Sequence, residues 1–218
     1  MVTGAMTENE VTKELTKDLG DLMRYADRNF DKKFRRDVIH ATIFPIYRRY
    51  TWLSRNKNTW TTIYEARTKR DVGDLSKVTN FVTAEGGIGK YAYMPTFVNR
   101  HIMWIIFPPH FFSRYNERRK VGKFGQALYD SFFKLNASFV FEIKDVVSED
   151  KQTMIREVYG STAEGVAMGV MTVEGNVLFR TFVTYDMLKG EQVEMYTKNE
   201  EIRKEIHEKY MSYAKSIN

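Results

Sequence analysis

The sequence predicts an α+β fold, in which N-terminal helices are followed by a largely antiparallel β-sheet with one or two packed helices and a C-terminal helix. Apolar residues near the N-terminus recur at helical spacings of three and four. After residue 58 the chain consists mostly of short runs rich in β-branched and aromatic residues, separated by turns. Strands joined by hairpins, with helices set apart from them, are typical of an α+β protein built on an antiparallel sheet.

Helical periodicity marks the N-terminal part of the chain. Between Glu8 and Tyr25 the apolar positions are Val11, Leu15, Leu19, Leu22 and Met23. We expect the helical pattern to continue from Phe30 to Tyr50, with an interruption at Pro45. Basic residues alternate with apolar ones in this second stretch: Lys32, Lys33, Arg35, Arg36, Arg48 and Arg49. They form either a solvated helix face or a strip that follows a phosphate backbone.

Strand-like runs fill most of the remaining chain. The first group is Trp60–Tyr64, Val78–Thr83, Tyr91–Phe97 and His101–Phe107. The second group is Ser138–Lys144, Thr153–Tyr159, Gly165–Thr172 and Asn176–Thr184. Glu174-Gly175-Asn176 predicts a hairpin turn. Gly86-Gly87-Ile88-Gly89 is interpreted as a turn as well, because it lacks the GK[ST] ending and the following helix of a phosphate-binding loop.

Helices are expected between and after the two groups of strands. Proline is favourable in the first helical turn, so a helix is predicted from Pro109 to about Lys120, followed by a second from Phe124 to Leu135. A charged helix with one apolar stripe is predicted over Asn199–Ser216. We therefore divide the chain into an N-terminal helical segment (residues 1–57), an α+β core (residues 58–192) and a C-terminal helix (residues 193–218).

Composition excludes several kinds of protein. The 218 residues are 43 % hydrophobic and 14 % aromatic, which suffices for a packed core. Cysteine is absent, which excludes disulfides, thiolate zinc sites and cysteine nucleophiles. A formal charge of +6 and a pI of 9.3 favour a polyanionic partner such as nucleic acid. The polar N-terminus and the absence of an apolar run of ~20 residues lead us to expect a soluble, cytoplasmic protein with no membrane partner.

One segment carries the main functional hypothesis. His110 lies in the first turn of the helix expected from Pro109, and Arg114 and Arg118 follow one and two turns later on the same face. The positive end of the helix dipole and the two arginines disfavour an imidazolium ion, so we expect a neutral ring that accepts a proton at about pH 7. The guanidinium groups can bind phosphate and stabilise a pentacovalent transition state. RNA suits this site, because its own 2′-hydroxyl is the nucleophile and neither a metal nor another cofactor is required.

A purely structural interpretation stays open beside this hypothesis. Arg114 can pair with Glu117, three residues further on, and His110 can cap the helix. The remaining apolar residues of the segment are expected in the core: Phe111, Phe112 and Tyr115.

The helix His110-Phe-Phe-Ser-Arg114-Tyr-Asn-Glu-Arg118, followed by a β-meander, resembles the barnase–EndoU–colicin E5/D–RelE-like group of metal-independent ribonucleases, in particular phage and mobile-element members. The stretches Glu164–Gly169 and Arg180–Leu188 are similar to the closing hairpin of that group. The resemblance covers about Trp60 to Gln192 and leaves the N-terminal helices without a counterpart. It implies an endoribonuclease, often a toxin, that leaves a 2′,3′-cyclic phosphate and has RNA, and in some cases an inhibitor protein, as partners.

The resemblance also implies a hydroxyl-bearing residue on a late strand that faces the helix histidine. Strand alternation puts Arg180, Phe182 and Thr184 on one face, where Arg180 and Thr184 would complete the site. Thr181 takes this role instead if the sheet packs the other way. The sequence does not identify a second acid or base, for which the residues considered are His101, Tyr185 and Glu164.

Two other functions stay open from the sequence. One is non-catalytic nucleic-acid binding through the basic surface, for which the assigned contacts are Arg48, Arg49, Arg119 and Lys120. The other is a phage structural or interaction protein that docks through its C-terminal helix. His40 and His207 are interpreted as surface residues, and no metal site is predicted.

Overall fold

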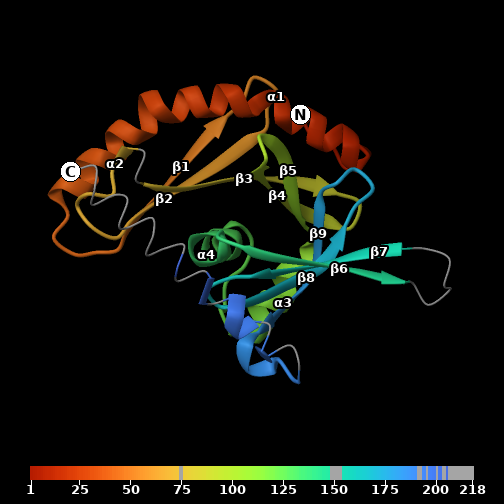
Figure 1. Cartoon of the computed structure of the whole chain (residues 1–218). Helices are drawn as coiled ribbons and strands as arrows, with labels where there is room; N and C mark the ends of the chain where they lie inside the picture. The colour runs from red at the N-terminus through yellow and green to blue at the C-terminus, as the bar shows by residue number, and fades with distance from the viewer. Residues whose placement is uncertain are drawn as a thin grey trace. The chain divides into compact units, whose positions relative to one another are not determined.

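The computed structural model describes residues 1–73, 76–147, 154–190, 193–194, 196–199, 201–202 and 205 (Figure 1). The chain divides into two compact units. Unit 1 comprises Met1–Pro109 and Thr172–Leu178, and unit 2 comprises His110–Met171 and Phe179–Asn218. Helices and mostly antiparallel strands occur in both units, which confirms the predicted α+β class.

Unit 1 begins with a helical region. Helix α1 (Glu8–Tyr25) starts at a capping box, in which the Thr7 hydroxyl accepts from the Glu10 amide and the Glu10 carboxylate accepts from the Thr7 amide. A π-helical turn (Ala26–Phe30) leads into α2 (Asp31–His40). The helix predicted for residues 8–25 is confirmed.

The helical interpretation of residues 46–50 is wrong, because these residues belong to strand β1 (Ile46–Leu53). Helix α2 ends at His40, before Pro45, and β1 then pairs antiparallel with β2 over its whole length. The pairing brings Tyr50 opposite Thr62 and Trp52 opposite Trp60. Aromatic residues stabilise such cross-strand pairs. The spacing of the apolar residues here fits a strand as well as a helix, and the pairing with β2 decides for the strand.

The strands of unit 1 form an antiparallel meander in the order β1-β2-β3-β4-β5. Strands β2 to β5 have the bounds Thr59–Ala66, Lys77–Gly86, Gly89–Val98 and His101–Phe107. The first residues of β9 pair in parallel with β5, where Ile105 lies opposite Val177. All four predicted strands are confirmed, and Gly86 lies opposite Gly89 at the predicted turn between β3 and β4.

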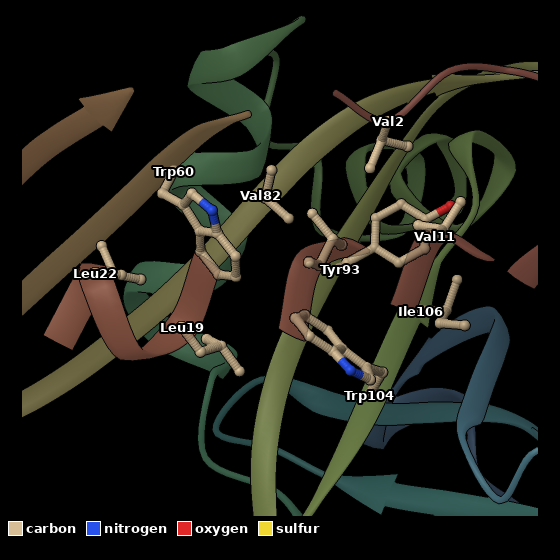
Figure 2. Packing of buried hydrophobic residues seen from close by; sticks show 10 residues of the cluster. Val2, Val11, Leu19, Leu22, Trp60, Val82, Tyr93, Trp104 and Ile106 are labelled. Carbon is tan, nitrogen blue, oxygen red and sulfur yellow. The ribbon is translucent and has the colours of Figure 1, made fainter. Parts of the chain in front are cut away.

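The core of unit 1 lies between α1 and the meander. The apolar stripe of α1 supplies Leu19 and Leu22, which pack with Trp60 of β2 and Trp104 of β5 (Figure 2). The two indole rings lie 6.1 Å apart at their centroids. A second cluster continues the core beneath the π-helical turn and α2: Ala26, Phe30, Phe34, Val38, Ile46, Tyr64 and Ala66. The helical periodicity of the sequence thus marks the residues that cover the sheet.

Unit 2 contains the remaining elements. Helices α3 (Pro109–Arg119, in unit 2 from His110) and α4 (Gln126–Asn136) precede strands β6 (Val140–Val147), β7 (Met154–Ser161), β8 (Gly165–Met171) and β9 (Val177–Thr184, in unit 2 from Phe179). The strands are hydrogen-bonded in the order β9-β8-β7-β6, and a 3-10 turn (Tyr185–Met187) follows β9. The predicted helices and strands are confirmed, apart from small shifts of their ends. The Thr172 amide donates to the Asn176 carbonyl at the predicted hairpin turn.

Aromatic rings make up much of the core of unit 2. Phe111 and Tyr115 of α3 pack edge-to-face on Phe132 of α4, with centroid distances of 5.2 and 5.0 Å. Phe182 of β9 packs against the same three rings. The prediction that the apolar side of α3 lies in the core is therefore confirmed.

Residues 193–194, 196–199, 201–202 and 205 are helical. The rest of the helix predicted over Asn199–Ser216 lies outside the described residues. In the part of the chain that the structure describes, no helix combines the length and apolar character that crossing a membrane requires.

Candidate active site

Helix α3 carries three of the residues predicted to be catalytic, His110, Arg114 and Arg118. Its buried side carries Phe111 and Tyr115. His110 and Arg114 are exposed beside this side. Arg118, three residues after Tyr115, is half-buried at its margin and reaches β9. His110 lies in the first turn, as predicted. We call the surface formed by His110, Arg114 and Arg118 the α3 face.

Arg114 has a partner on its own helix. Its Nη1 lies 3.0 Å from Oε2 of Glu117, three residues further on, and both side chains are more than half exposed. The ion pair that the sequence left open is thereby confirmed. Exposed pairs of this kind contribute on the order of 0.5 kcal/mol, so an anion of higher charge can compete for Arg114.

Arg118 contacts strand β9. Its Nη1 donates to the Thr181 hydroxyl at 3.2 Å and also to the backbone carbonyl of Phe182. A guanidinium group has five N–H donors, and within the described residues Nη1 is the only nitrogen of Arg118 that forms hydrogen bonds. The side chain is therefore held in place through one nitrogen, while Nε and Nη2 retain their hydrogens for another acceptor.

The predicted alternation of β9 is wrong over its centre. Phe179 and Phe182 were expected on opposite faces, yet both contact Phe111, at 6.2 and 6.1 Å. Buried and less buried residues alternate from Val177 to Phe179 and again from Phe182 to Thr184. Between the two stretches, across Arg180 and Thr181, the alternation is displaced by one residue. This shift places Thr181 toward Arg118 and leaves Arg180 exposed.

Thr184 is buried at the end of β9. It forms a side-chain hydrogen bond with Asp186, which lowers the pKa of that carboxyl below its usual value. Of the two threonines considered from the sequence, Thr181 is therefore the one that lies beside the α3 face.

A polar cluster that sequence reasoning did not assemble is centred on Glu164, in the turn between β7 and β8. Its Oε2 accepts from the Tyr115 hydroxyl at 2.8 Å and from Asn136 Nδ2 at 2.7 Å, and its Oε1 accepts from Arg119 Nη2 at 2.8 Å. Asn136 is fully buried and accepts from Thr162. These bonds join the end of α3, the end of α4 and the β7–β8 turn. We call these residues the Glu164 cluster.

The cluster determines the ionisation of its members. Burial by itself raises the pKa of Glu164, but the bonds from Asn136, Tyr115 and Arg119 together outweigh burial, and the pKa lies below its ordinary value. Burial and the bond to Glu164 both raise the pKa of Tyr115. Glu164 is thus a carboxylate with three donors and Tyr115 a neutral phenol. Tyr185, also considered as the second acid or base, donates its hydroxyl hydrogen to the Thr162 carbonyl at 2.5 Å.

The residues assigned to nucleic-acid binding lie in different units. Arg119 pairs with Glu164, and Lys120 is exposed directly after α3, in unit 2. Arg48 and Arg49 are exposed on β1, in unit 1. Arg48 donates to Asp37 of α2 at 2.6 Å, and Arg49 donates to the Thr61 hydroxyl at 3.4 Å.

The other histidines occupy separate positions. His101 is exposed at the start of β5, opposite Val98, and belongs to unit 1. His40 is exposed at the end of α2, and His207 lies outside the described residues. Among the described residues, no group of three or more His, Asp or Glu side chains is arranged to hold a metal ion.

The chain matches no known protein family, and no curated protein and no solved structure is significantly similar to it. Function is therefore inferred from the geometry of the α3 face and its surroundings.

Proposed function

We propose that this protein is a metal-independent endoribonuclease whose active site is the α3 face. The observation that carries the proposal is the position of His110, exposed in the first turn of α3, with Arg114 one turn further along the helix and Arg118 two turns further, at the contact with β9. One of them, Arg118, is held by β9 and keeps donors for a phosphate. The buried rings beneath α3 make this surface rigid, as a catalytic surface requires.

In the proposed reaction His110 takes the proton of an RNA 2′-hydroxyl, which attacks the adjacent phosphorus. Arg114 leaves Glu117 and binds a non-bridging phosphate oxygen together with Arg118. Both guanidinium groups then stabilise the charge of the phosphorane. Departure of the 5′-oxygen, protonated by solvent, leaves a 2′,3′-cyclic phosphate.

Cleavage of total RNA in EDTA tests the proposal directly. We expect the wild type to release products ending in 2′,3′-cyclic phosphate, and His110→Ala to be slower by at least about 100-fold, since a general base contributes about that much or more. His40→Ala is the matched control, because it removes an exposed histidine at the end of α2 that has no proposed role in the site, and it should leave the rate unchanged. Equal rates for wild type and His110→Ala, or cleavage that requires magnesium, would contradict the proposal.

A second function, nucleic-acid binding without cleavage, is favoured by a separate observation on α2. Four exposed cations lie on this helix: Lys32, Lys33, Arg35 and Arg36. The helix contains only two carboxylates against these four cations, and one of them, Asp37, is paired with Arg48 of β1. The helix thus presents an excess of positive charge of the kind that binds a phosphate backbone.

Salt-dependent binding distinguishes this second function. Reversing two of the α2 charges, in Arg35→Glu/Arg36→Glu, should weaken RNA binding and reduce the slope of log affinity against log salt by about 2. His110→Ala should leave that slope nearly unchanged. Binding that shows no dependence on salt would exclude an α2 surface for nucleic acid.

A further inference from the structure

Strand β6 leaves an open edge in unit 2. It is the terminal strand of the order β9-β8-β7-β6, and no strand among the described residues pairs with its outer side. Large apolar side chains of β6 and its neighbour β7 are exposed there: Ile143 by 50 %, Val147 by 57 % and Met154 by 65 %. An open edge with exposed apolar residues is a template for pairing with another strand.

We propose that the edge of β6 pairs antiparallel with β6 of a second copy of this chain, with Ile143 opposite Ile143 of the partner. The two copies are then related by a twofold axis that passes through this residue pair. The sheet of unit 2 would then continue from β6 of one copy to β6 of the other. The surface involves none of the residues of the α3 face, so the proposal is independent of the ribonuclease hypothesis.

The charges on β6 select this register. In an antiparallel pair, directly opposite residues lie on the same face, and like charges opposite one another destabilise the pair. Centring the pair on Glu142, Lys144 or Asp145 places that charge opposite its own copy. Centring it on Ile143 instead places Glu142 opposite Lys144 of the partner, twice by symmetry. The same register brings Val140 opposite Val146, so apolar residues also meet across the axis.

The existing ion pairs of β6 are compatible with this arrangement. Glu142 and Lys144 lie 3.6 Å apart on one face of the strand, and Lys144 lies 5.8 Å from the centre of the Tyr159 ring. In the dimer, Glu142 and Lys144 of one copy lie opposite Lys144 and Glu142 of the other. Positive and negative charges therefore alternate around this group of four side chains. Asp145 lies opposite Phe141 of the partner and keeps its own partner Arg156, 3.4 Å away in the same chain. No charge loses a counterion on association.

Charge reversal tests both the surface and its register. By sedimentation velocity we expect the wild type to dimerise with rising concentration. Glu142→Lys and Lys144→Glu each place two like-charge pairs across the axis, and each should weaken self-association by at least about tenfold. The double variant Glu142→Lys/Lys144→Glu restores both opposite-charge pairs and should dimerise as the wild type does. An equal mixture of the two single variants should form a heterodimer, because their β6 charges are complementary.

Two controls complete the experiment. Val173→Lys charges a fully exposed apolar residue in the turn between β8 and β9, which is not part of β6, and should leave dimerisation unchanged. Circular dichroism verifies that each variant is folded. A wild type that remains monomeric at high concentration would overturn the proposal. A dimer that withstands both single charge reversals, or that the double variant fails to restore, would overturn it as well.

Discussion

The carboxylate of Asp18 in α1 accepts a hydrogen bond from the indole Nε1 of Trp60 in β2 at 3.1 Å, and both residues are buried. The same carboxylate accepts from Asn56 and Asn58, each at 2.8 Å. Asn58 in turn accepts from the backbone amide of Val2 at 2.9 Å. The first helix, the β1–β2 turn and the N-terminal residues of unit 1 are thus joined through one buried carboxylate.

Removing this carboxylate should destabilise unit 1 strongly. Asp18→Ala leaves the buried donors of Asn58 and Trp60 and the half-buried donor of Asn56 without their acceptor, so we expect the free energy of unfolding to fall by about 3 kcal/mol or more. Asp18→Asn keeps one acceptor oxygen and should have a smaller effect. Urea denaturation followed by tryptophan fluorescence measures both losses, because Trp60 donates to Asp18 and reports on its surroundings.

The matched control for Asp18 lies on the same helix. Asp21 pairs with Arg24 at 2.5 Å, and both side chains are at least one-third exposed. Asp21→Ala should therefore change the free energy of unfolding by less than about 1 kcal/mol. Equal losses for Asp21→Ala and Asp18→Ala would contradict the role assigned to the buried network.

Glu164 should make the stability of unit 2 depend on pH. Its pKa lies below the ordinary value of 4.5, so the ionised carboxylate stabilises the folded state above that value. This stabilisation is lost as the pH falls through the lower, folded-state pKa. Glu164→Gln lacks the ionisation, so its free energy of unfolding should fall less than that of the wild type between about pH 5 and pH 3. Denaturant titrations at several pH values across this range measure the difference.

Glu174 provides the comparison for this measurement. It is exposed in the turn between β8 and β9, outside the Glu164 cluster. Glu174→Gln should retain the wild-type pH dependence. If the free energy of unfolding fell equally for wild type and Glu164→Gln as the pH is lowered, the charge of Glu164 would not stabilise the fold.

Gly165 permits a close approach between β8 and β9. A Cβ atom at this position would lie 2.2 Å from the Val183 carbonyl oxygen and 2.8 Å from the Phe182 ring. Gly165→Ala must displace backbone, so we expect a loss of about 1–3 kcal/mol, seen as a lower melting temperature. Gly87→Ala is the control, because a Cβ there has no atom within 4 Å. A Gly165→Ala variant as stable as Gly87→Ala would contradict the observed packing.

Local sequence patterns predicted the elements that local physics controls. Two prolines after an apolar run predicted the start of α3 at Pro109, because proline has the backbone angle of a first helical turn and lacks only a hydrogen bond donor that the helix does not use there. Periodicity predicted α1, and Gly175 predicted the turn before β9. The spacing of His110 and Arg114 likewise placed both on one exposed side of a helix without knowledge of the fold.

Tertiary pairing decided what local pattern leaves open. The spacing of the residues at positions 46, 50 and 52 fits either a helix or a strand. Only their pairing with β2 makes this segment the strand β1. The phase of β9 shifts across Arg180 and Thr181, where Arg118 binds Thr181 from another element. The Glu164 cluster joins residues 28 to 49 positions apart in the chain. Backbone preference and side-chain alternation act over a few residues, so the sequence by itself determined the helices, strands and turns of this α+β protein with the exception of β1. The partners of Arg118, Thr181 and Glu164 were decided by long-range packing, because each hydrogen bond forms only where folding brings distant donors and acceptors together.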